Sequence, residues 1–215
     1  MLRRSVDVAL GLFAVCSLLT NAGRAEDGPV FKHVIPTDAP QFARAFSADS
    51  RVGAMIFDNL FIDTEIGRGT LPSVRTKQFS YVLQPKSDKE VSVVQNIRGF
   101  VSTQGSGNAV LLINANGKPS TVDWKKAIQD AKVPPSPRFK ELEKTARKEA
   151  SELGFTDDRP AKFDDFFVEI KSPVPIGKPL QTTLVLLVDR LTGDDGSGAM
   201  IVIDSIDFEV LPEKK

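Results

Sequence analysis

From residue 52 onward, apolar and polar residues alternate along most of the chain, which is typical of β-strands that bury one face. In residues 73–85, Phe79, Tyr81 and Leu83 share one such face. Residues 179–191 are instead apolar on both faces in their middle, which predicts a central strand buried on both sides. The predicted strands are residues 52–65, with a bulge at Asp58 and Asn59, and residues 73–85, 90–103, 109–115, 118–124, 163–171, 179–191 and 199–211.

Two turn signals organise the middle of the chain. The glycine-containing residues 104–108 separate two of the strands. Asn116 and Gly117 form the pair preferred in two-residue type I′ hairpins, because both residues tolerate a positive φ. Together the turns predict that residues 90–103, 109–115 and 118–124 form a three-stranded antiparallel meander.

Between residues 123 and 154 the spacing of apolar residues becomes helical. We expect a first helix capped by Asp123, and a second helix capped by Ser136 that begins at Pro137 and ends at Gly154. Glu143 and Arg147 are predicted to form an ion pair on the solvent face of the second helix. The apolar stripe of the second helix consists of Phe139, Leu142, Ala146, Ala150 and Leu153.

This stripe has two interpretations. It covers part of the β-structure, or it is an arm that stays exposed until a partner arrives. Around eight strands joined by short turns predict an all-β fold, an antiparallel β-sandwich of jelly-roll type with a helical hairpin inserted at residues 123–154. A closed barrel is the alternative.

The N-terminal residues have the features of a secretory signal peptide. A basic start at Arg3 and Arg4 precedes an apolar run over residues 8–19, and small residues lead to a predicted cleavage after Ala25. We therefore divide the chain into a signal peptide (1–25), a partly ordered arm (26–50) with an edge strand near residues 31–35, and a β-sandwich domain (51–215). A retained membrane anchor and a lipid-modified Cys16 are the alternatives.

Composition excludes several kinds of chemistry. Cleavage after Ala25 would remove Cys16, the single cysteine, so the mature chain would have no disulfide and no thiol nucleophile. His33 is the single histidine, which rules out a multi-histidine zinc centre and leaves a Ser-His-Asp triad dependent on the N-terminal arm. The 28 basic and 28 acidic residues balance, unlike the basic footprint of a nucleic-acid-binding protein.

Two groups of residues are candidates for ligand binding. Trp124 and Tyr81 are the only aromatic residues other than phenylalanine, and a carbohydrate-binding module would present them as flat platforms for sugar rings. Asp194 and Asp195, in a glycine-rich loop, could join Asp204 in a calcium site, although the spacing is not that of an EF-hand. We expect no other cofactor.

The sequence therefore predicts an exported, non-enzymatic protein, periplasmic or secreted, that binds a partner protein or polymer through a sheet face or the helices. It predicts no contact with nucleic acid, and contact with the membrane only through the signal peptide. One alternative is a carbohydrate-binding module, with or without calcium. Another is a glycan hydrolase that uses two carboxylates of the adjacent pairs at 157–158, 164–165 or 194–195.

Overall fold

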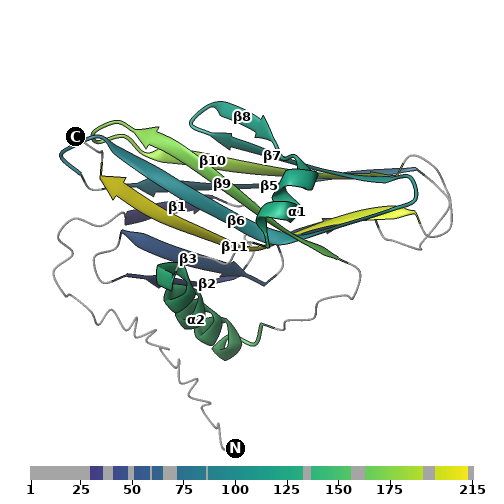
Figure 1. Cartoon of the computed structure of the whole chain (residues 1–215), viewed down its shortest axis with the longest axis horizontal. Coiled ribbons are helices and arrows are strands. Elements are labelled where there is room, and N and C mark those ends of the chain that lie inside the picture. The colour runs from purple at the N-terminus through teal and green to yellow at the C-terminus, as the bar shows by residue number, and fades with distance from the viewer. Residues whose placement is uncertain are drawn as a thin grey trace, which may run out of the picture.

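Two antiparallel sheets stack face to face in the computed structural model, which describes residues 30–35, 41–47, 51–58, 60–64, 72–85, 87–132, 137–155, 163–190 and 197–212 (Figure 1). Sheet A contains, in spatial order, β1 (Val30–Ile35), β5 (Ser73–Gln84), β10 (Leu180–Arg190), β7 (Gly107–Ala115) and β8 (Lys118–Thr121). Sheet B contains β2 (Phe42–Phe46), β3 (Val52–Phe57), β11 (Gly198–Pro212), β6 (Val91–Gln104) and β9 (Asp164–Val174). A short strand, β4 (Phe61–Asp63), pairs with β11. The predicted antiparallel β-sandwich is confirmed.

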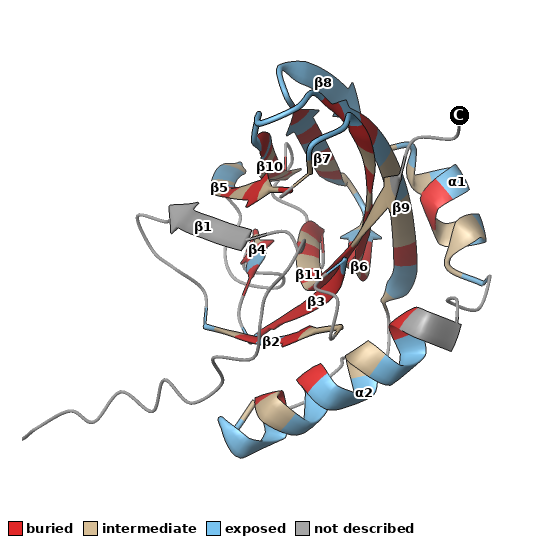
Figure 2. Ribbon diagram, turned by 90° about the vertical axis from the view of Figure 1, so that its left-hand side faces the viewer, coloured by how far each residue is buried: buried red, intermediate tan, exposed pale blue. Residues whose placement is uncertain are grey.

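The main core lies between the sheets, where alternate residues of each strand meet (Figure 2). Phe79, Tyr81 and Leu83 of β5 point into it, as their shared face predicts. The core also holds a buried polar contact between the sheets. The Tyr81 hydroxyl donates to Oε1 of Gln95 on β6 at 2.5 Å, and Oγ1 of Thr182 on β10 donates to the same oxygen at 3.0 Å.

The predicted three-stranded meander is wrong at its first connection. β6 pairs with β11 and β9 in sheet B, whereas β7 pairs with β10 and β8 in sheet A, so the turn at residues 105–106 carries the chain between sheets. Turn residues specify a reversal of direction, but they do not specify whether the flanking strands pair or stack. The second connection is confirmed, with Asn116 at φ 50° and Gly117 at φ 76°.

Three further observations concern the strands of the N-terminal half. The predicted strand 52–65 is divided into β3 and β4, which both pair with β11 on either side of the bulge between Ile203 and Ser205. β2 was not predicted, because its residues fall in the stretch interpreted as an arm. The predicted edge strand near 31–35 is present as β1, which pairs with β5.

The two predicted helices are present and pack on different strands. α1 (Trp124–Asp130) begins at Asp123, whose carboxylate accepts from the backbone N–H groups of Lys125 and Lys126, and it packs against β9. α2 (Pro137–Glu152) packs against β2 and β3 on the outer face of sheet B. No helix among the described residues meets the length and hydropathy needed to cross a membrane.

α2 creates a second, smaller core, so the interpretation of its stripe as a cover is confirmed and the exposed-arm alternative is wrong. Ala146 and Ala150 are buried against small and branched residues of β2 and β3, while Leu153 stays 55% exposed. Because α2 covers one side of β3 and sheet A covers the other, all of Val52–Phe57 is buried. The strand residues of this second core are Ala43, Ala45, Ala54 and Ile56.

Candidate binding surface on sheet A

The outer face of sheet A carries apolar side chains, but both described helices pack on sheet B (Figure 2). In β10, Leu184, Leu186 and Val188 point into the core and are fully buried, whereas Val185 and Leu187 point outward and are only partly buried. The prediction that β10 is buried on both sides is therefore wrong for its outer side. Its apolar residues there are not explained by the packing of the described elements.

The strand register gathers these residues into one patch. Val185 lies opposite Leu112 of β7, and Leu187 lies opposite Val110 of the same strand. Residues at facing positions of an antiparallel pair have Cβ atoms about 5 Å apart, so the four side chains are contiguous. We call Val110, Leu112, Val185 and Leu187 the aliphatic patch. Leu112 is 37% exposed.

Uncharged polar residues surround the aliphatic patch. On the β5 side, Gln78 faces Val185, and the hydroxyls of Ser80 and Thr183 hydrogen-bond at 2.9 Å. The residues that complete this rim are Thr76, Gln78, Ser80, Asn108, Asn114, Gln181 and Thr183.

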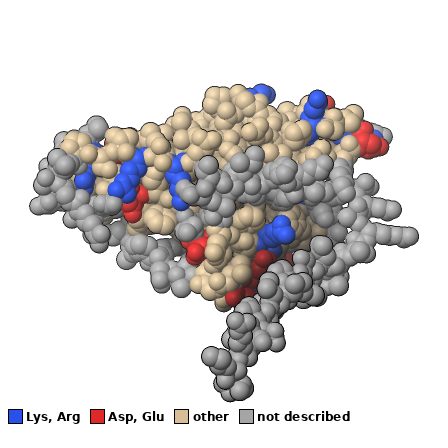
Figure 3. All heavy atoms as spheres, turned by 180° about the vertical axis from the view of Figure 1, so that it is seen from behind, with Lys and Arg blue, Asp and Glu red and all other residues tan. Residues whose placement is uncertain are grey.

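Charge is scarce on this face. Of the outward residues of β10, only Asp189 is charged, and its carboxylate accepts from Nδ2 of Asn108 at 3.2 Å. Charged residues make up 26% of the chain, so their scarcity over three long strands is a feature of this surface. The view from behind shows a mainly tan area in the upper middle of the molecule, with Lys and Arg side chains at its top edge and on either side (Figure 3).

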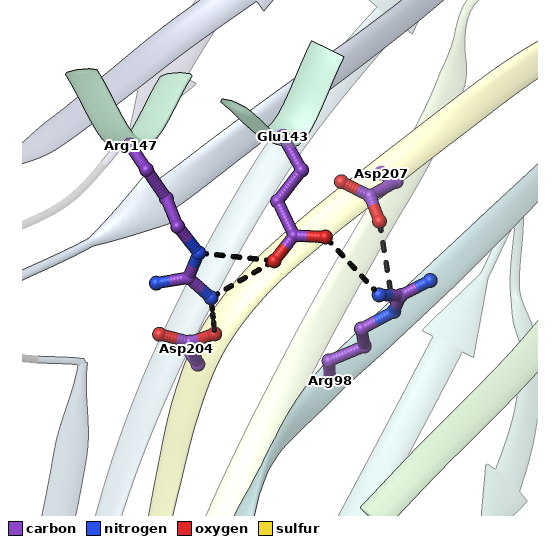
Figure 4. A network of polar contacts seen from close by, with 5 residues as sticks. All are labelled: Arg98, Glu143, Arg147, Asp204 and Asp207. Atoms are coloured by element: carbon purple, nitrogen blue, oxygen red, sulfur yellow. Dashed lines mark hydrogen bonds and ion pairs between the residues drawn. The ribbon is translucent and has the colours of Figure 1, made fainter. Parts of the chain in front are cut away.

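The outer face of sheet B is the opposite in character, because α2 covers a network of charges there (Figure 4). Nη2 of Arg147 lies 3.0 Å from Oε1 of Glu143 and 3.0 Å from Oδ2 of Asp204. Arg98 of β6 connects Glu143, at 3.5 Å, to Asp207 of β11, at 3.7 Å. The predicted Glu143–Arg147 pair therefore exists, but it faces the sheet instead of solvent.

Burial changes the pKa of Asp207 in this network. It is 1% exposed, and burial raises its pKa to about 7 in spite of the opposing charge of Arg98. A cleft of about 180 Å³ lies beside the network, and Phe167 and Asp165 of β9 line its far wall. Because Glu143 and Asp204 are ion-paired with Arg147, we interpret these carboxylates as stabilising the packing of α2 on sheet B.

The two predicted aromatic platforms occupy different environments. Tyr81 is fully buried between the sheets, so the prediction that it forms a ligand surface is wrong. Trp124 is partly buried, packs edge-on against Phe166 with ring centroids 5.2 Å apart, and donates from Nε1 to the Ala109 carbonyl at 2.6 Å. These contacts show how Trp124 fixes α1 to both sheets, and a role in ligand binding stays a prediction.

Of the predicted calcium site the structure describes only Asp204, so the site stays a prediction. Asp204 lies within β11, six residues or roughly 20 Å beyond the start of the strand, and it pairs with Arg147. Asp194 and Asp195 lie outside the described residues. No group of three or more acidic, histidine or cysteine residues suited to a metal ion occurs in the described part of the chain. His33 belongs to β1, opposite Val82, and Asp164 and Asp165 open β9.

The residues of the aliphatic patch were not singled out from the sequence. The signal was nevertheless present, since residues 179–191 are apolar on both faces. That pattern was interpreted as burial on both sides, because sequence alone does not show which sheet a helix covers.

Comparison with known proteins gives no family. No family model matches the chain, and no curated protein matches it. Among solved structures, the dimeric latent PorU of Porphyromonas gingivalis is similar over 87% of this chain at 12% identity and a TM-score of 0.34, and this chain spans only 14% of that protein. A family 35 carbohydrate-binding module from an environmental isolate is similar over 85% of this chain and 98% of its own length, at 15% identity and a TM-score of 0.28. At these TM-scores neither likeness bears on what this chain binds.

Proposed function

We propose that this protein is an exported, non-enzymatic β-sandwich that binds a protein partner through the outer face of sheet A. The observation that carries the proposal is the contiguous aliphatic patch at the centre of a nearly uncharged sheet face on which no described helix packs. Protein interfaces have this arrangement, with an apolar centre depleted of charge and a polar rim. Export rests on the features of residues 1–25.

The other predicted functions have less support. The carbohydrate-binding alternative required Tyr81 and Trp124 on one exposed face, and Tyr81 is buried. The hydrolase alternative required two acids facing each other in a cleft. Asp165 lines the cleft beside α2, but its doublet lies at the start of β9, and Glu143 and Asp204 of the same cleft are ion-paired with Arg147. Protein binding is therefore the best supported of the three functions.

Site-specific photo-crosslinking tests the proposal. A photoreactive amino acid is placed at position 112, 187 or 176 of the full chain, and crosslinking is carried out in the cells that export it. Ile176 is a matched control, because it is 61% exposed but lies in a turn away from the aliphatic patch. We expect positions 112 and 187 to crosslink the same protein, and position 176 not to do so.

A second variant links the crosslink to the aliphatic patch itself. Val185→Lys places a charge at the centre of this surface and should abolish the crosslink from position 187, because the lysine would have to be desolvated in the complex. Equal capture from all three positions, or capture that is unaffected by Val185→Lys, would contradict the proposal. The mass of the exported chain checks the predicted cleavage after Ala25.

A further inference from the structure

A different surface of the molecule, the edge between β8 and β9, is covered along only part of its length. β8 ends sheet A and β9 ends sheet B in the described part of the fold. α1 fills the beginning of this edge, where Trp124 contacts Phe166 and Ala127 enters the core. Beyond α1, a groove of about 210 Å³ runs between Lys118–Ser120 of β8 and Ile170–Pro173 of β9.

One wall of the groove is formed by β9, which has no strand beside its outer edge among the described elements. Pro173 lies opposite Ser92 in the ladder between β9 and β6. Since proline has no N–H to donate, it occupies positions of an edge strand where the backbone faces away from the neighbouring strand. Successive residues of a strand face alternate sides, so Lys171 also directs its N–H and C=O groups away from β6 and toward the groove.

The floor and rim of the groove differ in chemistry. Ile113 and Ala115 of β7 and Ile170 of β9 line it, and Ile170 remains partly exposed although it belongs to the main core. Lys118 and Lys171 stand on opposite rims. The groove therefore combines an apolar floor, a row of backbone donors and acceptors, and positive charge.

We propose that this groove binds a short extended peptide of a partner protein, which adds a strand to the free edge of β9. Alternate aliphatic side chains of the peptide would contact the floor, and an acidic side chain on its other face would pair with Lys171 and Lys118. The stretch of β9 that lines the groove, from Ile170 to Pro173, accommodates roughly 13 Å of extended chain. A second copy of β9 fits less well, because α1 packs against part of the same strand.

Fluorescence anisotropy with the mature full chain tests this site. The probe is a fluorescein-labelled peptide of sequence TVEVTV, and its counterpart TVKVTV replaces the central acid by lysine. We expect saturable binding of the first peptide and about tenfold weaker binding of the second. The charge-reversed variant Lys171→Glu should invert this preference.

A matched pair of variants separates backbone pairing from charge. Lys171→Ala removes the charge and keeps the N–H group, so it should retain most of the binding that Lys171→Pro abolishes. Should Lys171→Pro fail to fold, a TVEVTV peptide methylated at alternate backbone nitrogens supplies the same test, because only one of the two methylation patterns should prevent binding. Absence of saturable binding, or equal binding by both variants or by both methylated peptides, would overturn the proposal.

Discussion

The outer faces of the two sheets both carry apolar residues, but they differ in what packs on them. α2 packs on β2 and β3 of sheet B, whereas no described helix packs on sheet A. Between α2 and sheet B, Glu143 of α2 pairs with Arg98, which also contacts Asp207, and all three side chains are partly or fully removed from water. On sheet A the aliphatic patch is surrounded by hydroxyl and amide groups.

This difference supports the proposal that the outer face of sheet B has a structural role and that of sheet A binds a partner. Burying charges against a helix is costly unless they pair, and the network beneath α2 provides those pairs. Removing an uncharged aliphatic surface from water carries little free-energy penalty, which favours association with another protein. Variants on one outer face can therefore be compared with variants on the other.

The largest expected effect is a pH dependence that originates beneath α2. The pKa of Asp207 is raised from 3.8 to about 7, so the native state binds its proton more tightly than the unfolded state does. The contribution to the free energy of unfolding is complete below pH 4 and is lost as the pH rises toward 7, by up to about 4 kcal/mol.

Asp207→Asn should remove this loss. Urea unfolding at several pH values should show the variant more stable than the wild type at pH 8, with the difference shrinking toward pH 4. The charges that face Asp207 are Arg98 on β6, Glu143 and Arg147 on α2, and Asp204 on β11, and they remain in the variant. Identical pH profiles for the two proteins would show that Asp207 is not buried as described.

The next effect compares truncation of one aliphatic side chain on each face. Ile56→Ala creates a cavity beneath α2 and should lower the free energy of unfolding by about 3 kcal/mol. Leu187→Ala removes a partly buried side chain of the aliphatic patch and should cost about 1 kcal/mol or less. Urea unfolding of both variants gives the comparison, and equal losses would mean that the outer face of sheet A is also covered.

The smallest effect concerns the ion pairs that hold α2. Arg147→Gln removes the cation between Glu143 and Asp204, and it should lower the free energy of unfolding by about 1 kcal/mol. Because Arg147 is partly exposed, the loss should shrink in high salt. Chemical unfolding of wild type and variant at low and high sodium chloride checks this, and a salt-independent loss would indicate a packing effect instead.

The sequence predicted strands such as β5, β7 and β10 well because their buried and more exposed residues alternate. The Asn116–Gly117 hairpin, the Asp123 cap and the covering stripe of α2 were also predictable, since each depends on residues close together in the chain. The placement of β6 and β7 in different sheets was not, because the turn between them is compatible with either arrangement.

The candidate sites were harder to predict for the same reason. Whether Tyr81 meets solvent depends on sheet B, and whether Val185 is covered depends on which face α2 selects. Asp204 was grouped with the acids of the preceding loop by its position in the sequence, but the extended strand carries it to Arg147. Such distant contacts set the role of each side chain, and alternation along a single strand does not encode them.

The exposure of the outer face of sheet A is tested most directly by NMR on the isolated mature protein, which measures how accessible individual methyl groups are to a soluble paramagnetic gadolinium complex. If the outer face of sheet A is exposed, the methyls of Leu112 and Leu187 should show strong relaxation enhancement, whereas those of Ile56 beneath α2 should show little. Equal protection of all three residues would show that another part of the chain already covers sheet A, and it would contradict the proposal that this face is available to a partner.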